Sequence, residues 1–229
     1  DGIIQPTGGE ILIDGNPLDT SKKLPKEILR KMGFIFQNPN MLPWYTLRQN
    51  VALPNRIIGN TTCESEEYVD FLMNMAGLSE YKDAYPVEVS GGALQRAGVI
   101  RAMVHKPEIL LMDEPFGALD EMMREQLDMG LLLITHDLGV VTEVADRLAV
   151  MYAGRIVEQG DADAVLAHPA HPYTEALLHS VPRIENRGGD LLTIPGSPPN
   201  PTAVPSGCPF HPRCHRVVRA CPTVRPELV

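Results

Sequence analysis

The sequence predicts an α/β fold with a parallel sheet, followed by a loop-rich C-terminal part. Two uninterrupted apolar runs, residues 109–112 and 131–135, are typical of strands that are buried on both faces of a parallel sheet. Helical sequence lies between the two runs. This alternation indicates βαβ units, in which helices join consecutive parallel strands.

Shorter signals place the remaining elements of the α/β part. Residues 10–14 and 33–37 are expected to form short strands, and the first of them ends at an Asp-Gly turn signal. Residues 64–78 carry apolar side chains at helical spacing, with a glycine where the helix would stop. A further helix is expected from residue 90 to about residue 105.

The composition changes near residue 160. From His168 onward the chain is rich in proline, and it carries three of the four cysteines there. We therefore expect two domains, residues 1–160 for the α/β part and residues 161–229 for a loop-rich extension.

Composition and charge exclude some classes of protein. No apolar run approaches the length of about 18 residues that a membrane-spanning helix needs. The formal net charge of −9 provides no basic field for phosphate backbones, so nucleic-acid binding is not expected. Four cysteines in 229 residues make no disulfide scaffold and no secretory signal is present, so a reducing, cytoplasmic setting follows.

Polar side chains follow the predicted strands. Asp113 and Glu114 come directly after the run 109–112, at the carboxyl end where ligands of open α/β sheets bind. An aspartate there can hold Mg²⁺, and the next residue can polarise an attacking water. Gln37 and His136 each end or follow another strand and would lie at the same edge of the sheet. The alternative for each residue is a structural polar side chain in solvent.

Ser90-Gly91-Gly92 precedes a predicted helix. A serine hydroxyl and bare backbone N–H groups at the positive end of a helix dipole form a ready anion site. Taken alone, the same tripeptide is more often a flexible turn.

In this order, the motifs resemble those of the nucleotide-binding domain of the ABC ATPases. Gln37 matches the Q-loop, residues 89–96 the signature motif, residues 109–115 Walker B with its catalytic Glu, residues 118–120 the D-loop, and His136 the switch histidine. The resemblance implies an ABC-type P-loop NTPase core with a helical subdomain.

The resemblance also implies roles for these residues, with ATP and Mg²⁺ as the ligands. Asp113 and Gln37 would hold Mg²⁺, Glu114 would activate the hydrolytic water, and His136 would contact the γ-phosphate. The nucleotide-binding residues would be Gln37, Ser90, Gly91, Gly92 and Asp120. Because the signature of one subunit acts on the ATP of another, a homo- or heterodimer of ATPase subunits would be required.

Two departures from the family pattern stand out. No Gly-x-x-x-x-Gly-Lys-Ser/Thr loop occurs in the sequence, so we expect a fragment whose first strand and P-loop lie upstream of Asp1. Only residues 121–130 remain for a crossover that needs about a dozen. Residues 41–44 and 115–120 resemble nitrate/sulfonate importers, whereas residues 134–160 resemble oligopeptide importers. A mosaic chain and a loss of residues near 130 both explain this.

Residues 171–178 and 194–199 resemble the C-terminal extension of the oligopeptide, dipeptide and nickel importers' ATPases. This implies an ATP-hydrolysing subunit, peripheral on the cytoplasmic face of the membrane, that energises peptide import. It would work with a second ATPase subunit, two transmembrane permease subunits and, indirectly, a substrate-binding protein. The alternative is an incompetent subunit or fragment that donates its signature motif to a partner's ATP site. Soluble ABC ATPases of DNA repair or translation are disfavoured by the extension.

Three cysteines of the extension, Cys208, Cys214 and Cys221, have the spacing C-x₅-C-x₆-C. Some members of the resembled family hold an iron–sulfur cluster with such cysteines, and a [4Fe–4S] cluster usually takes four thiolates. His211 or His215 could instead complete a zinc site. Free structural thiols are the other reading.

Overall fold

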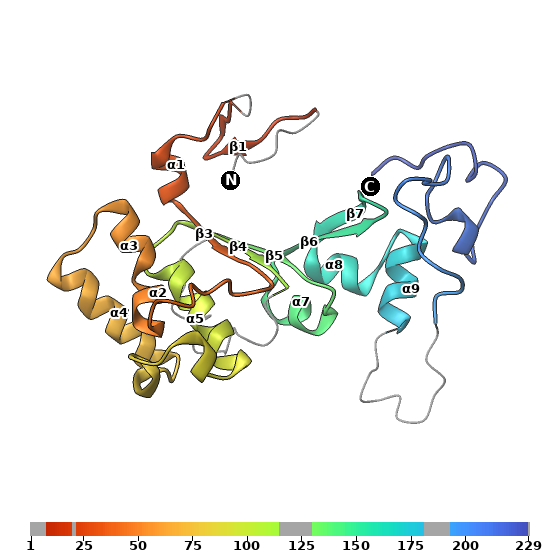
Figure 1. The fold of residues 1–229 in the computed structure, drawn as a ribbon. Coiled ribbons are helices and arrows are strands. Elements are labelled where there is room, and N and C mark those ends of the chain that lie inside the picture. The colour runs from red at the N-terminus through yellow and green to blue at the C-terminus, as the bar shows by residue number, and fades with distance from the viewer. Residues whose placement is uncertain (1–7, 20–21, 115–129, 181–192, 229) are drawn as a thin grey trace. The chain divides into compact units, whose positions relative to one another are not determined.

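The structure, a computed structural model, describes residues 8–19, 22–114, 130–180 and 193–228 (Figure 1). By its internal contacts the chain divides into two compact units, residues 1–135 and 136–229. The division falls just after the last strand of the parallel sheet. The sequence-predicted boundary near residue 160 lies inside the second unit and stays a prediction.

The first unit opens with a small hairpin. Strand β1 (Leu12–Ile13) pairs antiparallel with β2 (Asn16–Pro17), so the strand predicted over residues 10–14 is shorter than expected. Asp14 and Gly15 both have positive φ, 52° and 74°, as a two-residue type I′ turn requires. Helix α1 (Lys26–Arg30) leads from the hairpin to the sheet.

The sheet of the first unit has three parallel strands in the order β3-β4-β5. Strand β3 (Met32–Ile35) pairs with β4 (Ile109–Asp113), which also pairs with β5 (Gly130–Ile134). The α/β class and the βαβ connection between β3 and β4 are therefore confirmed. Because all three strands run the same way, their carboxyl ends lie at one edge.

Four α-helices connect β3 to β4 and gather on one side of the strands (Figure 1). They are α2 (Leu47–Val51), α3 (Leu53–Ile58), α4 (Cys63–Met75) and α5 (Gly91–Met103), with the short 3₁₀ turns Ser79–Tyr81 and Pro86–Glu88 between the last two. The Thr62 hydroxyl caps α4 by accepting the N–H of Ser65, and Gly77 ends it at a φ of 66°. Both predicted helices therefore form where the sequence places them.

A charged network fastens α2 to α4. The Arg48 guanidinium donates to Asp70 at 2.9 Å and to Glu66 at 2.8 Å, and Lys82 also lies 3.0 Å from Asp70. The hydrogen bond from Arg48 lowers the pKa of the Asp70 carboxyl to about 2. The carboxylate thus keeps its charge, and with it the tie between the helices, as the pH falls through the ordinary aspartate range toward about 2.

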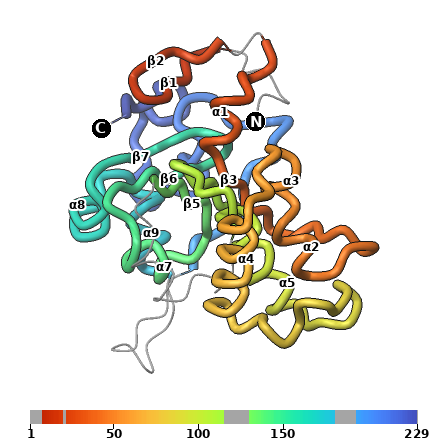
Figure 2. The backbone as a smooth tube through the Cα atoms, turned by 90° about the vertical axis from the view of Figure 1, so that its left-hand side faces the viewer, coloured from red at the N-terminus to blue at the C-terminus, as the bar shows by residue number. Residues whose placement is uncertain are grey.

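Helix α5 approaches β3 closely, as the backbone trace also shows (Figure 2). A Cβ on Gly33 would lie 2.5 Å from the Ala102 carbonyl oxygen and 2.8 Å from Leu110 Cδ1. His105 follows the end of α5 by two residues, and its Nε2 lies 3.0 Å from the Met32 carbonyl oxygen. Burial lowers the pKa of His105, so its ring is neutral and can donate from Nε2. Glycine is required at position 33 because the helix backbone occupies the space of a side chain.

One expectation about burial is wrong. Leu110 and Met112 of β4 are fully buried, as the apolar run predicts. In β5, however, Leu131, Leu132 and Ile134 are 39%, 57% and 59% exposed. Among the described residues β5 pairs only with β4, so it is an edge strand rather than a strand covered on both faces.

The second unit combines a hairpin with helices and the proline-rich extension. Helix α7 (Leu138–Val144) precedes β6 (Arg147–Tyr152), which pairs antiparallel with β7 (Arg155–Asp161). Helices α8 (Ala162–Ala167) and α9 (Pro172–Ser180) follow, and a 3₁₀ turn spans His211–Arg213. None of the helices in the described ranges has both the length and the apolar character that crossing a bilayer requires.

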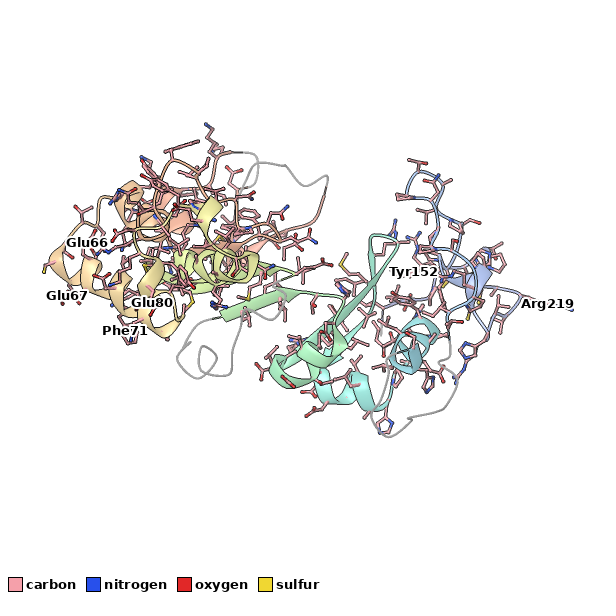
Figure 3. All side chains as sticks on the ribbon, turned by 60° about the horizontal axis from the view of Figure 1, so that its bottom comes forward. Glu66, Glu67, Phe71, Glu80, Tyr152 and Arg219 are labelled. Carbon is pink, nitrogen blue, oxygen red and sulfur yellow. The ribbon has the colours of Figure 1, made fainter. Side chains whose placement is uncertain are left out.

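Aromatic side chains form the core of the second unit. The rings of Tyr152 and Phe210 have centroids 5.3 Å apart, and Tyr173 packs against both. Figure 3 shows Tyr152 among the side chains of this unit and Arg219 at its edge.

The buried Glu158 carboxylate accepts the N–H groups of Ala170 at 2.6 Å and His171 at 3.0 Å. These bonds fix the chain at the start of α9.

We expect Gly33→Ala to destabilise the protein by about 2 kcal/mol or more, because the added methyl group must displace helix backbone. Gly130→Ala is the matched control, since a Cβ on this other strand glycine meets its nearest atom at 3.7 Å. Urea denaturation of both variants measures the difference. Equal stabilities would contradict the close approach of α5 to β3.

Candidate functional site

The ends of β3 and β4 bring Gln37 and Glu114 together. Gln37 lies two residues after β3, and Glu114 directly follows β4. Gln37 Nε2 donates a hydrogen bond of 2.9 Å to Glu114 Oε2, across 77 positions of sequence. An amide and a carboxylate therefore meet at the carboxyl edge of the sheet, where the sequence places them.

The backbone of Glu114 is unusual for a residue with a side chain. Its φ is 46°, in the left-handed region, which costs about 1 kcal/mol. Its N–H donates 2.8 Å to the carbonyl oxygen of Ile134, the last residue of β5. The bond extends the pairing of β4 with β5 by one residue and holds Glu114 in this conformation.

Asp113 is the last residue of β4 and opposes Ile134 in the sheet register. Its side chain is exposed, whereas Glu114 is partly buried. The two adjacent carboxylates thus differ in exposure and in backbone conformation, because Asp113 ends the strand and Glu114 leaves it with a positive φ.

A shallow pocket lies beside this pair, between the end of β3 and α5. The residues that line it are Phe34, Ile35, Phe36, Gln37, Pro39, Gln95, Gly98, Val99, Arg101 and Glu114. Gln37, Gln95 and Arg101 carry the hydrogen-bond donors of this lining. The pocket is thus walled by the helix that begins at the predicted signature motif.

Ser90 caps the N-terminus of α5, because its hydroxyl accepts the N–H of Ala93 at 3.3 Å. Gly91 and Gly92 form the first turn and are exposed. A Cβ on Gly91 would meet no atom within 4 Å. The first N–H groups of a helix have no partner within the helix, so this bare turn can receive an anion.

The remaining predicted site residues are His136 and Asp120. His136 opens the second unit, two residues after β5, and the next residue, Asp137, caps α7 by accepting the N–H of Gly139 at 2.8 Å. Asp120 lies outside the described residues, as does the predicted short connection up to residue 129.

The segment after Gln37 is held by a residue that the sequence analysis missed. Asn50 of α2 is fully buried, and its Oδ1 accepts the N–H of Leu42 at 2.8 Å. Its Nδ2 donates to the carbonyl oxygens of Leu42, Tyr45 and Thr46, at 3.0 to 3.1 Å. The available signal was an amide on the same helix face as the apolar residues Leu47 and Val51.

The structure does not support the predicted metal group at Cys208, Cys214 and Cys221. All four cysteines are free, and the described residues contain no group of three or more His, Cys, Asp or Glu that could hold a metal ion. Cys214 Sγ accepts the N–H of Arg216, and Cys221 Sγ accepts that of Val218. Burial, and secondarily the other two thiols, raise the pKa of Cys214, which disfavours the thiolate that a metal needs. The thiols instead serve turns and the aromatic core.

Two sequence families match the chain and identify the class of protein to which it belongs. Residues 1–117 match the family described as ABC transporter, and residues 157–221 match the oligopeptide/dipeptide transporter C-terminal region. The chain belongs to the ABC transporter ATP-binding family. The resemblance and the fold class predicted from the motifs are thereby confirmed, and the chain is an ATPase subunit by family.

Individual ABC ATPases agree with this assignment. A putative peptide import ATP-binding protein of Brucella ovis is 38% identical over 250 residues, with 96% of this chain and 74% of the relative covered. The oligopeptide transport ATP-binding protein AppF of Bacillus subtilis is 35% identical over 245 residues, with 98% and 74% covered. Both alignments are longer than the 229 residues of the chain, so each relative has residues without a counterpart here.

A solved structure shares the fold. The dimeric, post-hydrolysis state of the ATP-binding cassette MJ0796 bound to ADP and Pi superposes with a TM-score of 0.59 at 26% identity. The match covers 70% of this chain and 76% of that chain.

We expect Asn50→Ala to destabilise the protein by about 3 kcal/mol, because it empties a buried site and removes the hydrogen-bond partners of the Leu42 N–H and the Tyr45 carbonyl oxygen. Trp44 is the sole tryptophan and lies within this segment, so its fluorescence reports the loss during urea denaturation. Asn60→Ala is the control, since Asn60 is exposed. A change no larger than that of the control would show that Asn50 does not hold the segment.

Proposed function

We propose that this chain is the ATP-hydrolysing subunit of an importer and that it energises the uptake of peptides. The observation that carries the proposal is the 2.9 Å hydrogen bond between Gln37 and Glu114 at the carboxyl edge of the sheet. This edge is where nucleotides bind in open α/β folds. The next strand of the sheet, β5, leads into His136.

The donor set fits the Mg²⁺ ion of a magnesium nucleotide. The carboxylate oxygens of Asp113 and the amide oxygen of Gln37 are the hard ligands that Mg²⁺ takes. An amide can serve two partners, because its oxygen faces a cation while its nitrogen donates to Glu114. Bound Mg-ATP supplies the phosphoryl group, and the ion offsets its charge.

Glu114 is the residue that we assign to proton transfer. Its carboxylate accepts a proton from the attacking water, and the Gln37 N–H holds that carboxylate at the sheet edge. The Ile134 carbonyl fixes its backbone from the neighbouring strand. By the family resemblance, His136, which follows β5, would contact the γ-phosphate.

The signature motif acts on the nucleotide of a second ATPase subunit. The exposed first turn of α5, with Ser90, Gly91 and Gly92, offers N–H groups and a hydroxyl to such a ligand. We assign Asp120 to the same shared site. The dimeric state named for MJ0796 supports an assembly of two subunits.

The transported substrate is inferred from relatives. Those of Brucella ovis and Bacillus subtilis are named for peptide import and oligopeptide transport, and residues 157–221 match the C-terminal region of such transporters. We therefore assign peptides as the substrate class. The subunit lies peripherally on the cytoplasmic face of the membrane, beneath two permease subunits that receive peptide from a binding protein.

The test is phosphate release by the protein assembled with its paired ATPase and permease subunits. We expect Glu114→Gln to lower kcat at least about 100-fold, because the water loses its proton acceptor. Glu108→Gln is the matched control: this exposed carboxylate precedes β4 at its other end, where it pairs with Lys31 at 2.8 Å.

The two variants separate the possible results. Loss of activity in Glu114→Gln but not in Glu108→Gln supports hydrolysis at this subunit's own site. Activity that requires the paired subunit and survives Glu114→Gln would instead identify a subunit that only donates its signature motif.

A further inference from the structure

Arg101, near the end of α5, grips the segment that follows Gln37. Its Nη1 donates 3.2 Å to the Asn40 carbonyl oxygen, and its Nη2 donates to the Pro39 carbonyl oxygen. Nη1 also lies 3.5 Å from Met41 Sδ. The guanidinium is partly buried, and its rigid fork suits two neighbouring acceptors at once.

Gly98, one turn earlier on α5, brings the helix against the same segment. A Cβ at this position would lie 3.1 Å from Pro39 Cβ. Residues three apart share one face of a helix, so Gly98 and Arg101 form a single contact surface. Both residues also line the pocket that contains Gln37 and Glu114.

The hydrogen bonds from Arg101 lie close enough to Gln37 in the chain to restrict its position. Pro39 is two residues beyond Gln37, and each residue spans at most about 3.6 Å of chain. With Pro39 and Asn40 fixed, the Gln37 side chain has little freedom to leave its 2.9 Å bond to Glu114. Such a bond keeps a donor–acceptor distance of about 2.7 to 3.2 Å and weakens steeply when its angle falls below about 120°.

The same helix carries the signature motif at its other end. Helix α5 begins after Ser90, and a rise of 1.5 Å per residue places Arg101 about 16 Å along the axis from it. The segment after Gln37 and the signature motif are therefore both attached to the same helix, α5.

We propose that Arg101 is a positioning residue for ATP hydrolysis: it holds residues 39–41 on α5, so that Gln37 stays at Glu114 and moves together with the signature turn. This inference rests on the proposed function for its kinetic consequence. The grip itself needs no nucleotide and can be tested separately.

The first experiment measures the grip by hydrogen exchange of the segment 37–46 in the isolated chain. Leu42 and Tyr45 donate their N–H groups to partners at 2.8 and 3.2 Å, so their exchange reports opening of the segment. We expect Arg101→Met to accelerate this exchange about tenfold, and Arg101→Lys by less, because one ammonium can still reach a carbonyl. Arg30→Met is the control, since Arg30 donates to the Ile58 carbonyl at 3.3 Å, away from this segment.

The second experiment is a double-mutant cycle on phosphate release by the assembled importer. Arg101→Met is expected to lower kcat about tenfold and to change the KM for ATP by less than kcat, because Gln37 is only one of the residues that would hold Mg-ATP. In the Gln37→Ala background the same substitution should cause no further loss.

Each result decides the matter. Unchanged exchange in Arg101→Met, or additive kinetic losses in the cycle, would overturn the proposal. If Arg101→Met does not fold, Arg101→Lys supplies both measurements, with smaller effects in the same direction. If the assembly hydrolyses no ATP at all, the proposed function fails, and the exchange data alone decide whether Arg101 grips the segment.

Discussion

The parallel pairing of β3 with β4 is the constraint on which the rest of the structure depends. It aligns two strands that are far apart in sequence so that their carboxyl ends coincide, and it thereby sets Gln37 beside Glu114. Strand β5 continues the register and holds the backbone of Glu114 through the Ile134 carbonyl. A shift of one residue in this register would turn the side chains at the strand ends to opposite faces and would separate Gln37 from Glu114.

Helix packing maintains that register and extends its effect. Gly33 lets α5 rest on β3 at backbone distance, and His105 ties the chain after α5 to the start of β3. From there Arg101 and Asn50 hold the segment beyond Gln37 from two different helices. The position of one amide at the sheet edge is thus set by contacts with α2 and α5 as well as by its own strand.

The sequence allowed the centre of the fold and the meeting of strand ends to be predicted, because both follow from local patterns. The apolar run of β4 reports real burial, whereas the equally apolar run of β5 lies on an edge: a run of leucines does not say what covers it. The left-handed backbone of Glu114 and the grip of Arg101 depend on contacts between distant segments, which no single-sequence pattern encodes. Cysteine spacing suggested a metal group, yet two of these thiols accept backbone N–H groups in turns.

The measurement that tests the central claim most directly is the NMR signal of the Gln37 side-chain amide in the chain of 25.2 kDa, assigned through Gln37→Asn. A hydrogen bond to a carboxylate moves the amide proton to lower field. The account predicts that Glu114→Ala shifts this signal back, while Glu108→Ala leaves it in place. A Gln37 signal that does not respond to Glu114→Ala would contradict the pairing of the two strand ends.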